Sequence, residues 1–281
     1  MATLSQLILY PIKSCAGIVV EEATLTIAGL AAEGVHDREW MVVAPDGQFL
    51  TQREYPRMAL VVPRVEGDAL VVRSAGMAPL VLPLAPACDA PTRVVHIWDD
   101  EVDAADCGDG AAAWISSVLG GRCRLVRFRP VVVRPTSTKW TGGEAAQTRF
   151  ADGYPLLLTG AASLADLNRR LVAAGRDELP MDRFRPNLVV EGIEAFEEDY
   201  VESFTAGDVV IKPVKPCARC PIPAIDQGTG ETGPDPLDIL QTYRGIARMD
   251  GAICFGMNCI VTAGGGARLH VGQALDVVLA F

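Results

Sequence analysis

Short runs of apolar residues separated by turn residues dominate the first 130 or so positions of the chain. Examples of these runs are "SQLILY", "WMVVAPDGQFL", "MALVVPRVEGDALVVR" and "PLVLPL". Asp46-Gly47 and Gly67-Asp68 lie between such runs, and pairs of this kind are typical of the tight turns of β-hairpins. Strands so short and so closely spaced predict an antiparallel sheet or barrel and disfavour alternating strand–helix units.

Helical periodicity is confined to a few segments. "GAAAWISSVL", residues 110–119, predicts a helix that ends at the following pair of glycines. "SLADLNRRLVAAG", residues 163–175, has the clearest pattern, because its leucines fall on one apolar stripe. Ser163 and Asp166 have the spacing of a capping box, and Gly175 is a typical helix end.

The remaining sequence returns to strands after a long irregular segment. "FRPVVVRPTSTKWTGGEAAQTRFADGYP", residues 128–155, is rich in Pro, Thr and Gly and predicts a loop over the surface or across a cleft. The later runs "NLVVEG", "DVVIKPV", "AICFGMNCIVTA" and "ALDVVLAF" predict strands, with a short helix at "PLDILQTYR". The pattern as a whole predicts a mainly β fold with a few helices, in the α+β class.

Composition narrows the functional classes. Of 281 residues, 49% are apolar and 21% charged, and the net charge of −10 disfavours non-specific binding to nucleic acid or anionic membrane. No window approaches the ~18 apolar residues of a transmembrane helix, and the N-terminus reads as a strand and not as a signal peptide. We therefore expect a cytoplasmic protein with reduced cysteines, most of them packed in the core.

One cysteine pair stands out, in "VKPCARCPIPAID". Cys217 and Cys220 could be half of a zinc site, a redox dithiol, a metal thiolate with a neighbour, or two core thiols. A second such pair is missing and the three histidines are scattered, which disfavours structural zinc. Pro221 and Pro223 follow at once among predicted strands, which disfavours a thioredoxin-like dithiol. Two interpretations of the pair therefore remain: one cysteine as a metal ligand, or both as packed thiols in the core.

Several basic residues lie in short polar motifs at predicted strand ends or loops. They are Lys13 of "YPIKSC", Arg38 of "HDREW", Arg185 of "RFRPN" and Arg219 of "CARC". Each alone is typical of a solvated surface charge. Together they suit an anionic ligand, since the planar guanidinium group donates two parallel hydrogen bonds to a phosphate.

The same motifs, in the same order, resemble the MOSC-domain proteins, in particular the branch with the mitochondrial amidoxime-reducing component and its bacterial relatives. "LYPIKSCAGIVVEEA" and "DREWMVV…GQFLTQREYPRMALV" are similar to the family's N-terminal β-barrel domain. "DGYPLLLTGAASLADLNRRL", "FRPNLVVEG", "VKPCARCPIPAIDQGTGE" and "PLDILQTYR" are similar to the MOSC domain proper. The resemblance implies an N-terminal antiparallel β-barrel-like domain at residues 1–125 packed on a MOSC β-barrel domain at 126–281, with a cofactor cleft at their interface.

A molybdenum cofactor, a pterin dithiolene that carries a phosphate, is what the resemblance implies as ligand. By motif position the protein ligand to the metal, and the catalytic residue, is Cys220, the second cysteine of the pair. The positions that match the family's contacts to the pterin and phosphate are Lys13, Ser14, Arg38, Gly153, Tyr154, Arg185, Asn187, Ala218, Arg219 and Asn258. Gly153, Tyr154 and Ala218 depart from the family's residue types and can carry over main-chain contacts only, and Asn258 stands where the family has a tyrosine.

The activity implied by the resemblance is the reduction of N-hydroxylated compounds such as amidoximes or hydroxylaminopurines. The chain carries no flavin or iron–sulfur signature, so we expect electrons from a separate donor protein of the ferredoxin, flavin reductase or cytochrome type. We expect neither the C-terminal iron–sulfur domain of some bacterial relatives nor the membrane anchor of the mitochondrial ones. The alternatives are a molybdenum cofactor carrier, a sulfur-transfer module that uses Cys220, and a zinc-stabilised β protein.

Overall fold

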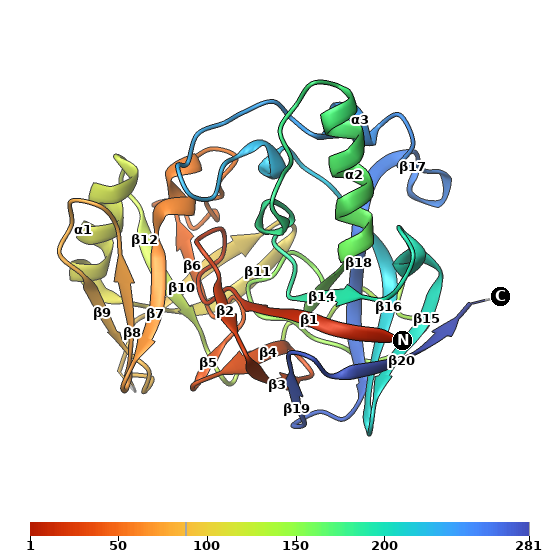
Figure 1. Cartoon of the computed structure of the whole chain (residues 1–281). Helices are drawn as coiled ribbons and strands as arrows, with labels where there is room; N and C mark the ends of the chain where they lie inside the picture. The colour runs from red at the N-terminus through yellow and green to blue at the C-terminus, as the bar shows by residue number, and fades with distance from the viewer. Residues whose placement is uncertain (88, 281) are drawn as a thin grey trace.

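The computed structural model describes residues 1–87 and 89–280 and confirms a mainly β fold with a few helices. Seven strands of the largest sheet close into a barrel, in the order β13, β14, β1, β20, β15, β16, β18 and back to β13. Their bounds are β1 (Ala2–Leu9), β13 (Leu156–Gly160), β14 (Leu188–Glu191), β15 (Val201–Ala206), β16 (Val209–Ala218), β18 (Ala252–Ala263) and β20 (Ala274–Leu279). Two short strands extend this sheet, β2 (Ile18–Val20) beside β1 and β17 (Gly245–Ile246) beside β18 (Figure 1).

The first strand of the chain completes this barrel. β1 pairs with β14 and β20, which come from the second half of the sequence. The pairing register shifts between Leu4 and Gln6, and such a bulge changes which side chains face inward, so that Leu4, Leu7 and Leu9 all reach the core. The end of β1 lies beside the start of β14, where the amide of Ile8 donates to the carbonyl of Asn187. The loop after β1 and the segment before β14 are therefore neighbours.

Three smaller sheets form the rest of the β structure. A four-stranded sheet has the order β10, β11, β12, β6; a second has the order β19, β3, β4, β5; a third consists of β7, β8 and β9. Their bounds are β3 (Glu22–Thr26), β4 (Gly29–Ala32), β5 (Val35–His36), β6 (Trp40–Val43), β7 (Val62–Glu66), β8 (Ala69–Arg73), β9 (Leu80–Pro83), β10 (Thr92–Ile97), β11 (Asp100–Asp106), β12 (Arg124–Phe128) and β19 (Arg268–His270). The turns predicted at Asp46-Gly47 and Gly67-Asp68 are confirmed, since both glycines adopt a positive φ between paired segments.

The helices are α1 (Gly108–Leu119), α2 (Ala161–Ala173) and the single turn α3 (Leu237–Leu240). α1 confirms the predicted helix and ends at Gly120, whose φ is 74°. The predicted capping box was wrong, because α2 begins two residues earlier and Ser163 lies inside it. The Ser163 hydroxyl instead donates to the carboxylate of Glu198, which also accepts the amide of Gly160 at the helix start. A distant carboxylate thus caps this helix.

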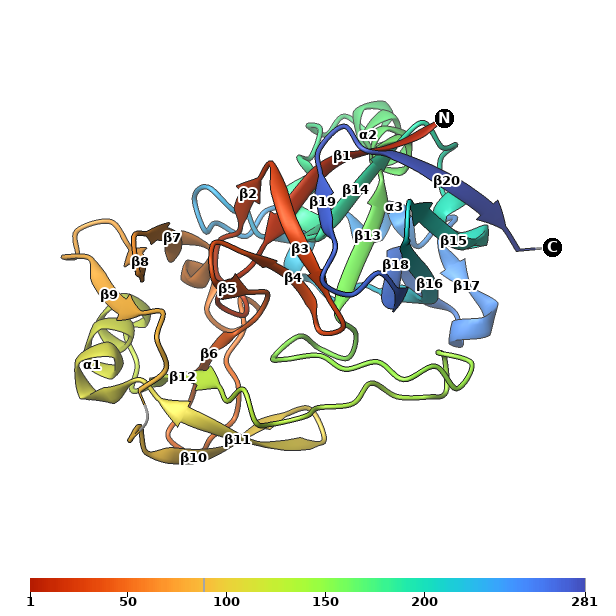
Figure 2. The same ribbon diagram turned by 90° about the horizontal axis from the view of Figure 1, so that it is seen from below.

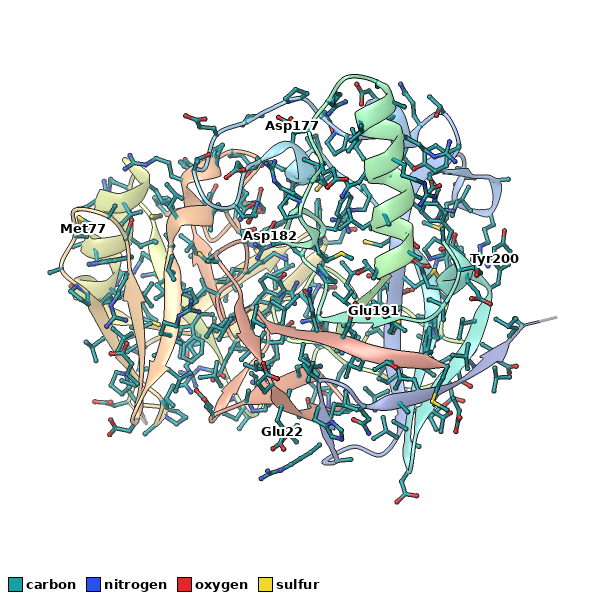
Figure 3. All side chains as sticks on the ribbon, in the orientation of Figure 1. Glu22, Met77, Asp177, Asp182, Glu191 and Tyr200 are labelled. Carbon is teal, nitrogen blue, oxygen red and sulfur yellow. The ribbon has the colours of Figure 1, made fainter. Side chains whose placement is uncertain are left out.

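The predicted division near residue 125 is crossed by strand pairing, since β1 and β3 both pair with strands from the second half. The segment from residue 129 to residue 155 contains no strand and runs as a long loop past both halves, as predicted (Figure 2). Side chains fill the space between the ribbons of the two halves (Figure 3).

The expectation that most of the cysteines are packed in the core is met in part. Cys15, Cys123, Cys254 and Cys259 are buried, Cys107 is half-buried, and Cys88 lies outside the described residues. Within residues 1–87 and 89–280, no helix combines the length and apolar character needed to cross a membrane.

Candidate functional site

Three segments that are distant in sequence meet next to the barrel. The segment after β1 runs beside the residues that lead into β6, with the amide of Lys13 donating to the carbonyl of Trp40 at 2.8 Å and the amide of Arg38 to the carbonyl of Tyr10 at 2.7 Å. The segment before β14 joins them through the guanidinium group of Arg185, which donates to the carbonyl of Cys15 at 2.7 Å. Five predicted contact residues therefore share one neighbourhood: Lys13, Ser14, Arg38, Arg185 and Asn187.

Three residues of this group have a left-handed backbone. The φ angles of Ser14, Arg38 and Arg185 are 63°, 47° and 56°. A non-glycine residue in this region costs about 1 kcal/mol or more and persists only where the surroundings enforce it. Such strain concentrates at active sites and ligand clamps, so this backbone conformation is consistent with a binding site in these loops.

A buried network orients Arg38. Its guanidinium Nη1 donates to a carboxylate oxygen of Asp37 at 2.5 Å and to the side-chain oxygen of Asn187 at 3.0 Å. The Asn187 amide in turn donates to the other Asp37 oxygen at 2.9 Å, and the Tyr10 backbone amide donates to that same oxygen. Asp37 is only 2% exposed; burial raises its pKa, while Arg38 opposes the shift. Asp37, which the sequence did not single out, is the residue that holds Arg38 and Asn187 together.

Arg185 is a buried cation. The residue is 8% exposed, and within the described ranges it forms no ion pair with a carboxylate. Its guanidinium group lies 4.4 Å from the centre of the Tyr10 ring, as does that of Arg38, and it donates to the side-chain oxygen of Gln227 at 3.2 Å. Burial lowers the pKa of Arg185 and raises that of Tyr10 to about 12. Buried charge is costly unless it is paired, so this arrangement favours an anionic ligand.

Lys13 reaches towards the long loop. Its ammonium group donates to a carboxylate oxygen of Asp152 at 2.6 Å, and the Trp98 indole nitrogen donates to the same oxygen at 3.1 Å. Although burial pushes the pKa of Asp152 upward, Lys13 and Trp98 outweigh it and bring that pKa to about 2. Asp152 precedes Gly153, one of the predicted contact positions, and a Cβ atom placed at residue 153 would have no neighbour within 4 Å among the described residues beyond those adjacent in the chain.

Two glutamines support these loops. The side-chain amide of Gln52, a fully buried residue, donates to the carbonyl of Ser14 at 2.8 Å and to the side chain of Gln227 at 3.0 Å. Gln227 connects in turn to Arg185. Neither glutamine stands out in the sequence, although both lie within stretches that resemble the family, "FLTQREYP" and "PAIDQGTGE". Their link to Ser14 and Arg185 exists only in the folded chain.

The cysteine pair lies where β16 ends. Ala218 is the last residue of β16 and pairs with Cys254 of β18, and Cys220 follows it, half-buried. Arg219 donates to the Phe184 carbonyl at 2.9 Å, next to Arg185, and to the Cys217 sulfur at 3.2 Å. Arg219 thus links the Cys220 segment to the loop that carries Arg185.

Tyr154 and Asn258 belong to a second group, around Lys215. The Asn258 amide donates to the Lys215 carbonyl at 3.2 Å, and the Lys215 ammonium lies 5.9 Å from the centres of the Tyr154 and Trp140 rings. The Tyr154 hydroxyl is buried without a hydrogen-bond partner among the described residues. Among the described residues, no hydrogen bond or cation–π contact joins these two side chains to the group around Arg38.

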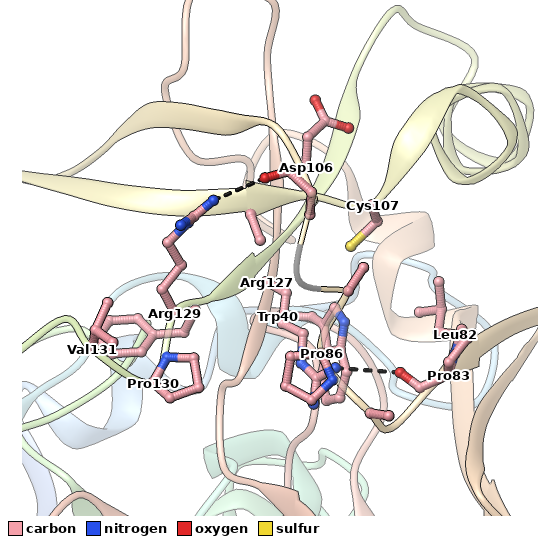
Figure 4. A pocket seen from close by; sticks show the side chains of 15 residues that line it. Trp40, Leu82, Pro83, Pro86, Asp106, Cys107, Arg127, Arg129, Pro130 and Val131 are labelled. Carbon is pink, nitrogen blue, oxygen red and sulfur yellow. Dashed lines mark hydrogen bonds between the residues drawn. The ribbon is translucent and has the colours of Figure 1, made fainter.

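An open pocket of about 260 Å³ lies elsewhere, between β9, β11 and β12 (Figure 4). It is lined by Trp40, Leu82, Pro83, Cys107 and Arg129 among others, and it includes none of the predicted site residues. Within the part of the chain that the structure describes, no three His, Cys, Asp or Glu side chains are grouped to bind a metal ion. The structural-zinc alternative, which needs about four such ligands, has no ligand set there.

Two family profiles match this sequence. The MOSC N-terminal beta barrel domain matches residues 1–122, and the MOSC domain matches residues 145–276. The fold and the match therefore define a MOSC-domain protein, as the motifs predicted.

The most similar curated relatives include three amidoxime-reducing components. "Mitochondrial amidoxime reducing component 2" of Rattus norvegicus is 37% identical over 87% of this chain and 73% of its own length. "Mitochondrial amidoxime-reducing component 1" is 36% identical in Mus musculus and 34% identical in Homo sapiens, each over 87% of this chain and 72% of the relative. The chain belongs to the family of MOSC-domain proteins that contains the mitochondrial amidoxime-reducing components.

Proposed function

We propose that this protein is a molybdenum-cofactor-dependent reductase of N-hydroxylated compounds, such as amidoximes or hydroxylaminopurines. The observation that carries the proposal is the group formed by Lys13, Arg38 and Arg185, two of them on strained backbones, beside the segment that ends in Cys220. Its relationship to proteins named as amidoxime-reducing components supports the choice of substrate.

The residues present fit the cofactor. Arg185 is buried without a carboxylate partner in the described ranges, and an anionic phosphate would supply the missing charge. The half-buried Cys220 offers a soft thiolate ligand, which suits a metal that is already bound by sulfur.

Each side chain would have a distinct task. Cys220 would hold the metal, while Lys13, Arg38 and Arg185 would neutralise the phosphate despite the acidic surface. Asn187 orients Arg38 both directly and through Asp37, and Gln52 holds the backbone of Ser14 by donating to its carbonyl. The remaining predicted contacts are proposed at Gly153, Tyr154, Ala218, Arg219 and Asn258.

When bound, the cofactor supplies an acceptor for the oxygen atom of the substrate. An amidoxime that takes up two electrons and two protons yields an amidine and water. The pKa of Asp152 is about 2, so this carboxylate stays ionised near neutral pH and positions Lys13 and Trp98 without donating a proton. We propose that the electrons come from a separate donor protein of the ferredoxin, flavin reductase or cytochrome type, and that the protein acts in the cytoplasm.

The test measures molybdenum and pterin per chain together with benzamidoxime reduction by a chemical electron donor. We expect both components in the purified protein and reductase activity that Cys220→Ala lowers by at least about 100-fold. Cys217→Ala is the matched control, because it removes the other thiol of the pair, and it should keep most of the activity.

Other results would point elsewhere. Full activity in Cys220→Ala would refute the ligand assignment, and zinc without molybdenum or pterin would refute the reductase. Bound cofactor with no turnover of any N-hydroxylated compound would favour a cofactor carrier. A persulfide on Cys220 after incubation with a cysteine desulfurase, in the absence of molybdenum, would favour sulfur transfer.

A further inference from the structure

Trp98 occupies an unusual position at the edge of the site. It is the first of two residues that connect β10 to β11, and its φ is 54°. In two-residue hairpin loops a left-handed first position usually carries glycine or asparagine, because a bulky side chain there is strained. The indole is nevertheless 52% exposed, so burial in a core does not explain why a large aromatic residue stands there.

A shared hydrogen-bond acceptor joins the Trp98 side chain to the site. The indole nitrogen and Lys13 donate to the same oxygen of Asp152. The Asp152 side chain is 71% exposed, yet enough protein surrounds it for burial to push its pKa upward. Trp98 and Lys13 therefore meet on an accessible carboxylate at the edge of the site.

The base of Trp98 is rigid. Arg134, 5% exposed, donates to the carboxylate of Asp100, two residues after Trp98, at 2.8 Å and to the backbone carbonyl of Asp152 at 2.9 Å. This arginine ties the hairpin to the loop that carries Asp152. The Phe49 ring meets the indole edge-on at 5.1 Å, and the guanidinium group of Arg53 lies 5.0 Å from the ring centre. The indole is thus held in one orientation from several sides.

We propose that Trp98 is a specificity-determining residue, a platform on which the planar ring of an aryl or purine N-hydroxylated substrate stacks. The proposal rests on the proposed reductase function and adds to it a preference for aromatic over small aliphatic substrates. Stacking on an aromatic side chain contributes about 1 to 1.4 kcal/mol, which corresponds to an affinity ratio of about 5 to 10.

Two variants separate stacking from the hydrogen bond to Asp152. Trp98→Phe keeps a ring but lacks the N–H donor, whereas Trp98→Gln keeps a donor of similar reach but lacks the ring. Benzamidoxime and acetamidoxime carry the same reacting group on a phenyl and on a methyl substituent. For the cofactor-loaded protein we expect Trp98→Gln to raise KM for benzamidoxime about 5- to 10-fold, with kcat within twofold and acetamidoxime unaffected. Trp98→Phe should stay within about threefold of the wild type for both.

A structural role alone predicts another outcome. If Trp98 only fastens the hairpin to Asp152, Trp98→Phe should be the more damaging variant, and both substrates should suffer equally. That result, or no effect of Trp98→Gln on benzamidoxime, would overturn the proposal.

A binding measurement keeps this test separate from the proposed function. We expect benzamidoxime, but not acetamidoxime, to quench a component of the tryptophan fluorescence that is missing in Trp98→Phe. Quenching without turnover of either compound would leave the platform standing and refute the reductase. Turnover of benzamidoxime without quenching and without a Trp98→Gln effect would refute the platform alone.

Discussion

Removal of Arg38 is the sharpest test of the buried network beside the barrel. In Arg38→Met, the carboxylate of Asp37 stays 2% exposed but loses its cation and keeps only the Tyr10 amide and the Asn187 side chain as donors. Breaking a buried ion pair by removing one partner costs about 3 to 5 kcal/mol. With 281 residues that unfold as one unit, the entropy of unfolding is about 0.6 kcal/mol per degree, so Tm should fall by about 5 to 8 °C.

A companion variant isolates the cause of this loss. Adding Asp37→Asn removes the stranded charge and should recover at least half of the free energy of unfolding that Arg38→Met loses. Urea unfolding of the wild type, both single variants and the double variant measures the coupling.

The pH dependence gives a second signature. Burial raises the pKa of Asp37, and the loss of Arg38 must raise it further. A group with a raised folded-state pKa loses its stabilising contribution as pH rises through that pKa, so the deficit of Arg38→Met should grow as pH rises above the unfolded pKa of about 3.9. A deficit below about 1 kcal/mol, or one that Asp37→Asn does not reduce, would show that the network does not hold Asp37 as described.

Further predictions concern the packing around the site and the two halves of the chain. Gly17→Ala would place a methyl group 2.7 Å from the Tyr10 ring and should lower the free energy of unfolding, measured in urea, by about 1 to 3 kcal/mol. Gly110→Ala is the control: this residue lies inside α1, a Cβ there has nothing within 4 Å, and the free energy of unfolding should rise by up to about 1 kcal/mol. Burial raises the pKa of Glu198, so Glu198→Gln should remove part of the stability loss that the wild type shows as pH rises above the unfolded pKa of about 4.3; an unchanged slope would contradict this. Although burial opposes it, hydrogen bonds from two arginines lower the pKa of Asp106 to about 2, so its contribution should disappear as pH falls from about 4 to 2, and Asp106→Asn should lack that loss.

Local turn chemistry explains what could be predicted of the fold. Asp46-Gly47 and Gly67-Asp68 specify tight turns within a few residues, and Gly120 ends α1, so these features are readable in sequence. The pairing partners of the strands cannot be predicted in the same way, because alternation of apolar and polar residues predicts a strand but not the strand beside it. The pairing of β1 with β14 and β20 depends on contacts between opposite ends of the chain.

The same distinction holds for the site. Lys13, Arg38 and Arg185 could be singled out because each lies in a short motif, and the structure brings all three together. Gln52 and Trp98 could not be singled out in this way. Nothing local in the sequence shows that Gln52 will contact Ser14 or that Trp98 will contact Asp152. Ser163 is an example of a local pattern that gave a wrong prediction. Its spacing to Asp166 predicted a capping box, but its hydroxyl donates to Glu198, 35 positions away.

X-ray absorption at the molybdenum edge tests the proposed bond between Cys220 and molybdenum. The count of sulfur neighbours around the metal distinguishes a cysteine ligand from the dithiolene alone. We predict one sulfur neighbour fewer in Cys220→Ala than in the wild type, and an unchanged count in Cys217→Ala. An unchanged count in Cys220→Ala, or the loss of a sulfur neighbour in Cys217→Ala, would show that Cys220 is not the ligand.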